Sequence, residues 1–186
     1  MDLELRRHSW GSLQGISGDA RALGDALCDL SRAGGREVAL DAARRVERVV
    51  FAQGLLSETS TALASSLVHC LWRCSDYSED IILGLLSDIS AAVVSEEDPG
   101  VYGPASEVEC MKEIILGYPA YVEILETSAT LDSRTAYIDL ILMCGLFSGD
   151  LRHRSVYFLE SAQGLAGLEG NLGLISASLE ELRGAG

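Results

Sequence analysis

The chain has 186 residues, of which 48% are hydrophobic, and a formal net charge of −14. This length and apolar content suffice for one folded domain with a buried core, and they exclude a disordered acidic tail. Residues 49–186 carry the whole imbalance, because basic and acidic residues are equal in number over 1–48. A surface of this sign repels nucleic acid and anionic membranes and attracts a basic partner protein.

Apolar residues recur at helical spacing along the chain, and no segment alternates with the period of a strand. We therefore expect an all-α protein, with helices over about 18–33, 37–52, 58–74, 79–94, 104–116, 119–126, 134–147, 151–166 and 172–183. Gly34 and Gly35 should end the first helix, whereas Ser57 and Ser78 are the expected N-caps of the third and fourth helices.

Each predicted helix has one apolar face and is joined to the next by a short turn, so neighbouring helices must cover one another. Helix pairs recur about every 35–45 residues, which favours a single domain over 1–186. We expect it to be an α-solenoid of HEAT or armadillo-like helical hairpins. An irregular helical bundle is the alternative, because no residue pattern repeats cleanly.

Apolar stripes identify the buried faces of three predicted helices. They are Ala20, Leu23, Ala26, Leu27 and Leu30 in the first, Val38, Ala42, Val46, Val49 and Val50 in the second, and Leu172, Ile175, Leu179 and Leu182 in the last. Leu3, Leu5 and Trp10 precede the first predicted helix, and they either pack on it or form a homodimer contact.

The longest apolar run covers 135–147, which is shorter than the roughly 20 residues needed to span a bilayer, and Asp139 interrupts it. The first ten residues lack the apolar core of a secretory signal peptide. The five cysteines are odd in number. We therefore expect a reduced, cytoplasmic compartment in which the thiols act as small buried hydrophobes.

Several short motifs are spread over most of the chain. They are Trp10 with Gly18-Asp19-Ala20, Asp25-Ala26-Leu27 with Arg44, Arg45 and Arg48, Gln53-Gly54 with 59–64, and Gly117-Tyr118-Pro119 with Arg134 and Ala136-Tyr137. In these motifs the chain resembles bacterial HEAT-repeat proteins, a group common in actinobacteria. The resemblance implies a right-handed stack of helix pairs with a concave binding face, no enzymatic activity and no common function.

The sequence contains no signature of a hydrolase, a nucleotide-binding loop or a zinc protease. His69, Cys70 and Cys74 form the best metal candidate, but a fourth ligand is not evident and buried thiols are the favoured interpretation. The cluster Arg152-His153-Arg154 either contacts a partner or pairs with Asp150 or Glu160. We expect no catalytic residue, metal or cofactor.

Carboxylates on the predicted second helices of the pairs and on the fifth helix are the candidate protein-binding residues, namely Asp80, Asp88, Glu107, Glu109, Glu113 and Asp139. On one side of a solenoid they would form a negative trough. Arg134 is expected to be structural, tying adjacent turns together through Asp132 or an acid of the next repeat. Asp132 or Ser133 is the expected N-cap of this helix.

These features favour a non-enzymatic protein-binding scaffold or inhibitor with an acidic concave surface, for example an immunity-type protein that neutralises a basic toxin. A regulatory or structural subunit of a larger complex or homo-oligomer is the alternative. A HEAT-like enzyme such as a DNA glycosylase is disfavoured, because such an enzyme needs a basic surface to hold DNA. The expected partner is a basic protein, with no nucleic acid and no membrane.

Overall fold

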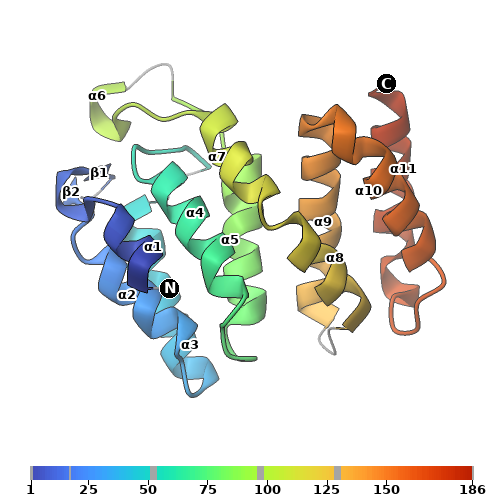
Figure 1. Ribbon diagram of the computed structural model, residues 1–186, viewed down its shortest axis with the longest axis horizontal. Helices are drawn as coiled ribbons and strands as arrows, with labels where there is room; N and C mark the ends of the chain where they lie inside the picture. The colour runs from blue at the N-terminus through green and yellow to red at the C-terminus, as the bar shows by residue number, and fades with distance from the viewer. Residues whose placement is uncertain (1, 17, 51–53, 96–98, 128–130, 186) are drawn as a thin grey trace. The chain divides into compact units, whose positions relative to one another are not determined.

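The computed structural model describes residues 2–16, 18–50, 54–95, 99–127 and 131–185, and within these ranges the side chains of 2, 18, 19, 99, 100 and 131–134 are outside the description. The described residues are predominantly helical, which confirms the all-α prediction (Figure 1). Contacts divide them into two compact units, 1–114 and 115–186, and each is described by itself. The expectation of a single repeat domain over 1–186 stays a prediction.

The first unit contains α1 (Asp2–Arg7), α2 (Leu23–Ser31), α3 (Arg36–Val50), α4 (Ser60–Leu71), α5 (Glu79–Ala91), α6 (Pro99–Tyr102) and α7 (Glu107–Ile115), whose last residue reaches the boundary. It also holds the 3-10 turn η1 (Trp10–Ser12) and the two-residue strands β1 (Gln14–Gly15) and β2 (Gly18–Asp19). The second unit contains α8 (Tyr118–Thr127), α9 (Leu131–Phe147), α10 (Gly149–Ala162), η2 (Glu169–Asn171) and α11 (Leu172–Gly184).

The predicted absence of strands and the predicted start of the first helix are both wrong. β1 and β2 pair antiparallel, with Gln14 opposite Asp19, so the helix begins only at Leu23. The backbone N–H of Gln14 also donates to Glu58 Oε2 at 2.8 Å. The predicted helix over 18–22 is therefore replaced at its start by the pairing of β2 with β1, and β1 in turn contacts Glu58.

The predicted caps had different outcomes. Ser78 occupies the N-cap of α5 as predicted, although its hydroxyl accepts no hydrogen bond from the N–H groups of the helix and instead donates to the Leu30 carbonyl at 2.5 Å. Ser57 does not cap α4, because Thr59 holds that position and the two hydroxyls lie 2.7 Å apart in a buried hydrogen bond. The cap expected at Asp132 or Ser133 lies outside the described side chains.

The apolar stripe predicted for the first helix is confirmed, since all five residues are buried. In the stripe predicted for the second helix, Ala42, Val46 and Val50 are buried as predicted. Val38 is 54% exposed, and the buried face of α3 instead begins at Ala39. In α11, Ile175, Leu179 and Leu182 are buried as predicted, whereas Leu172 is exposed.

Helix pairs stack in the same way within each unit. In the first unit α2 packs on α3 and α4 on α5, and the two pairs meet through α2 against α4 and α3 against α5 (Figure 1). In the second unit α8 packs on α9 and α10 on α11, with α8 against α10 and α9 against α11. First helices thus lie beside first helices and second helices beside second helices.

The N-terminal segment is fastened to the first unit by a polar cluster. Glu4 accepts hydrogen bonds from Arg7 at 2.9 Å and from the Ser65 hydroxyl of α4 at 2.6 Å, and it lies 3.2 Å from His8 Nε2. The Trp10 indole donates to the Leu5 carbonyl at 2.8 Å, and both side chains are buried. Leu5 and Trp10 therefore pack within the chain, whereas Leu3 is 85% exposed.

Two helical glycines should respond in opposite ways to alanine. A Cβ on Gly145 of α9 would lie 2.7 Å from Leu182 Cδ2 and from Ser155 Oγ, whereas a Cβ on Gly84 of α5 would meet nothing within 4 Å. Overpacking should make Gly145→Ala destabilising by about 1–2 kcal/mol, while Gly84→Ala should stabilise by about 0.5–1 kcal/mol through helix propensity. Urea unfolding of both variants measures this, and a stabilising Gly145→Ala would contradict the close packing of α9.

The N-terminal cluster should make stability depend on pH. Burial, followed by the charge of Arg7, lowers the pKa of His8 below its ordinary value of 6.5. Burial alone would raise the pKa of Glu4, but hydrogen bonds from Ser65 and Arg7 outweigh it, so that pKa lies below 4.5. At these two groups the unfolded chain binds more protons than the folded chain. The contribution of the cluster to stability is therefore present above pH 6.5 and is lost on acidification, first through His8 and then, below pH 4.5, through Glu4.

Thermal unfolding of the wild type and of His8→Gln between pH 5 and 7 tests the histidine part. The wild type should lose more stability than the variant over this range, and equal losses would show that His8 is not responsible.

Candidate protein-binding groove

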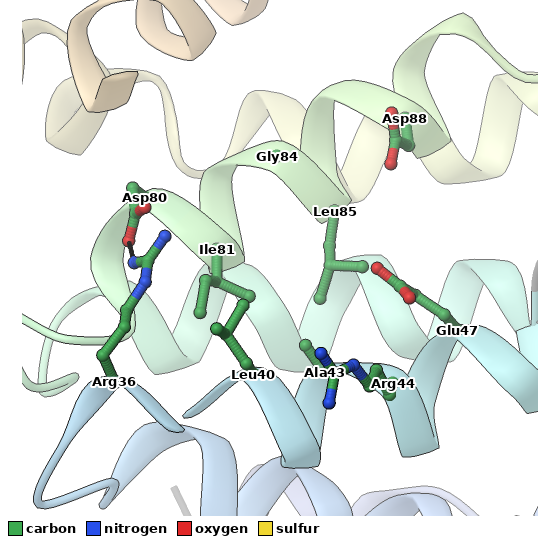
Figure 2. Close-up of a pocket in the computed structure, with 10 residues that line it drawn as sticks. All are labelled: Arg36, Leu40, Ala43, Arg44, Glu47, Asp80, Ile81, Gly84, Leu85 and Asp88. Atoms are coloured by element: carbon green, nitrogen blue, oxygen red, sulfur yellow. Dashed lines mark hydrogen bonds and ion pairs between the residues drawn. The ribbon is translucent and has the colours of Figure 1, made fainter. Parts of the chain in front are cut away.

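A groove of about 430 Å³ lies between α3 and α5, the second helices of the two stacked pairs in the first unit. Its lining residues come only from these two helices and are Arg36, Leu40, Ala43, Arg44, Glu47, Asp80, Ile81, Gly84, Leu85 and Asp88. Figure 2 shows the two sets of side chains projecting into the space between the helices. The groove therefore follows from the stacking of α3 on α5.

Helical spacing explains how a single face of each helix supplies this lining. Arg36, Leu40 and Glu47 recur at intervals of four and seven residues on α3, which keeps them on one side of the helix. On α5, Asp80, Gly84 and Asp88 recur every four residues. The missing side chain of Gly84 keeps the middle of the groove open, since a Cβ there would have no neighbour within 4 Å.

One end of the groove is closed by an ion pair. Arg36 Nη1 lies 2.5 Å from Asp80 Oδ1 and also donates to the Tyr77 carbonyl at 3.4 Å (Figure 2). Asp80 lies in the first turn of α5, where a negative charge also suits the helix dipole. This pair joins the beginning of α3 to the beginning of α5.

The other end carries charged groups that the described part of the chain leaves unpaired. Arg44, Glu47 and Asp88 make no hydrogen bond or ion pair with any described residue, and these three line a second hollow of about 490 Å³ together with Arg48. Partial desolvation raises the pKa of Asp88 above its ordinary value of 3.8. Charged groups in this state are available to a partner that brings the opposite charge.

The groove is balanced in charge. Its three carboxylates, Glu47, Asp80 and Asp88, face Arg36 and Arg44, and Arg48 lines the adjoining hollow. Asp80 and Asp88 therefore do not belong to a purely negative trough, because arginines line the same groove.

The other four predicted site residues lie elsewhere. On α7, Glu107 accepts from the Val94 N–H at 3.0 Å, Glu109 pairs with Lys112 at 2.7 Å, and Glu113 lies 3.8 Å from Arg7. Asp139, on α9 of the second unit, is half-buried, and burial raises the pKa of its carboxyl. Of the six predicted residues, only Asp80 and Asp88 line the groove.

The α3 side of the groove was not predicted from the sequence. Arg36 and Glu47 belong to none of the predicted sites, and Arg44 was named only as part of the family resemblance. The four-residue spacing of Arg36, Leu40 and Arg44 was a usable signal, but it identifies a helix face without showing which helix it meets.

The cysteines show no arrangement for a metal among the described residues. Burial raises the pKa of Cys70 to about 12 and that of Cys74 to about 11, which disfavours the thiolates that a metal needs. No group of three or more potential ligands is arranged to hold a metal in the described ranges.

Among the described residues the basic cluster pairs with neither Asp150 nor Glu160, and Glu160 instead lies 2.5 Å from Arg183 of α11. The alternative, contact with a partner, stays a prediction. Arg154 lies over the Tyr118 ring at 5.6 Å. The predicted structural role of Arg134 falls outside the described side chains.

The chain matches no family model, no curated protein and no solved structure. Among the described residues, no helix is both long enough and apolar enough to cross a membrane. The resemblance to HEAT-repeat proteins therefore stays a prediction.

The Arg36–Asp80 pair should contribute measurable but modest coupling between α3 and α5. A double-mutant cycle of Arg36→Ala and Asp80→Ala should give a coupling free energy of up to about 1 kcal/mol that decreases with added salt. The Arg45–Asp29 pair, at 2.8 Å, is the matched control, and its coupling should be smaller because Asp29 is 54% exposed against 16% for Asp80. Equal couplings for both pairs would contradict a specific role for the groove pair.

Proposed function

We propose that this chain is a non-enzymatic protein-binding module of α-solenoid type, which holds a segment of a partner protein in the groove between α3 and α5. The observation that carries the proposal is the row of charged groups at the open end of the groove, where Arg44, Glu47 and Asp88 lack partners among the described residues. A solvent-exposed groove with such groups can bind a partner segment through both a complementary shape and specific polar contacts.

The stacking within each unit supports a solenoid. In a helical solenoid, equivalent helices of successive pairs lie side by side and form a layered surface. The contacts of α2 with α4 and α3 with α5, and of α8 with α10 and α9 with α11, follow this rule. The second helices α3 and α5 then form one continuous surface, which is where a solenoid of this kind binds its partners.

The distribution of charge favours a partner that is basic overall. The net charge of −14 would steer such a partner toward the protein and raise the rate of association at low ionic strength. The balanced groove then favours a segment with both signs, with a basic side chain for Glu47 and Asp88 and an acidic one for Arg44. An immunity-type inhibitor of a basic toxin is one form that this function would take.

Affinity capture with groove variants tests the proposal. Gly84→Phe fills the groove without changing charge, and Asp88→Arg reverses one of its unpaired charges. Each should lose the partner that the wild type retains, with affinity reduced about tenfold or more, whereas Glu180→Arg on the exposed face of α11 should retain it. The same partner should elute earlier as salt is raised.

A partner captured equally by the wild type and both groove variants would refute the groove as the binding surface. Light scattering that shows a stable homo-oligomer broken by Gly84→Phe would instead assign the groove to self-association.

A further inference from the structure

A second cavity, of about 520 Å³, lies where α1 and the η1 turn adjoin α2. It is lined by Leu5, Arg6, His8, Trp10, Arg21, Gly24, Asp25, Cys28 and Arg32, and it shares no residue with the groove between α3 and α5. Its volume lies within the range of small-molecule binding sites.

One face of α2 and its flanking residues forms the long wall of this cavity. Arg21, Asp25, Cys28 and Arg32 are spaced by four, three and four residues, which places them in a row along the helix. Gly24 lies in the same row, and a Cβ there would come within 3.4 Å of the Trp10 ring. The indole therefore lies directly beside the backbone of α2 at Gly24, and a large side chain at this position would enter the adjoining space.

The opposite wall is held in place before any ligand arrives. The Trp10 indole N–H donates to the Leu5 carbonyl at 2.8 Å, and the His8 ring packs edge-on against Trp10 with centroids 5.3 Å apart. His8 is fixed in turn by Glu4 at 3.2 Å. An aromatic and apolar wall that is already ordered loses little entropy on binding.

The rim is positively charged, unlike the chain as a whole. Among the described residues that line the cavity, the three arginines Arg6, Arg21 and Arg32 are accompanied by one carboxylate, Asp25, whereas the whole chain carries a net charge of −14. Arg6 makes no hydrogen bond or ion pair with the described residues. Three guanidinium groups around an apolar floor form an environment suited to a carboxylate, because arginine binds carboxylates through paired N–H donors.

We propose that this cavity binds a small organic carboxylate with a flat apolar body. The carboxylate lies among Arg6, Arg21 and Arg32, and the apolar body lies against Trp10 and Leu5. This site is separate from the proposed protein-binding groove, so either assignment can fail without the other.

Calorimetric titration of the full chain with 1-naphthoate is the direct test. One molecule should bind per chain, and the uncharged 1-naphthamide should bind about tenfold or more weakly because it lacks the charge. Absence of naphthoate binding would overturn the proposal. Equal binding of naphthoate and naphthamide would show that the arginines do not recognise the carboxylate. Binding of inorganic phosphate as tightly as naphthoate would show that the apolar wall does not contribute to binding.

Variants locate the site. Arg6→Gln and Arg32→Gln should each weaken naphthoate binding about tenfold, and Gly24→Leu should abolish it by filling the cavity. Arg73→Gln removes the same charge from an exposed position outside the cavity and should leave binding unchanged. A loss of binding in Arg73→Gln equal to that in Arg6→Gln would show that only overall charge matters.

Discussion

The structure depends on a simple constraint: a helix pair in this chain cannot cover its own apolar faces. The first unit meets it by laying α2 on α4 and α3 on α5, and a buried hydrogen bond from Ser78 to the Leu30 carbonyl ties the two pairs together. Because α3 and α5 then run side by side, the faces that they turn toward one another line a groove with both charged and apolar residues. The stacking that buries the core therefore also creates the surface proposed to bind a partner.

The two candidate sites differ in charge from the chain as a whole. The chain as a whole is strongly acidic, yet the groove carries nearly equal numbers of both signs and the cavity beside α2 is basic. The overall field selects partners at a distance, where it favours basic proteins. At contact, the charges that line each site determine which ligand fits. The proposed ligands are therefore a segment of mixed charge for the groove and a carboxylate for the cavity.

Helical periodicity predicted most helices and much of the core from sequence, because long amphipathic segments carry a strong signal. It failed where distant contacts decide the structure, as at Gln14, which bonds Glu58. Helical periodicity also predicted that Val38 is buried, whereas its neighbour Ala39 is buried instead. Both residues are apolar, so only the position of the partner helix determines which of them is covered. Asp80 and Asp88 were predicted for the site, but the arginines opposite them were not, because the sequence does not show which face of α3 meets α5.

The side-by-side placement of α3 and α5 is the central claim, and methyl NMR tests it most directly. Leu40 on α3 and Ile81 on α5 point toward one another across the groove (Figure 2). With methyl-labelled protein we predict nuclear Overhauser effects that link Leu40 to Ile81 or to Leu85. Their absence from a sample that shows the effects expected between α2 and α3 would contradict the stacking, and with it the groove.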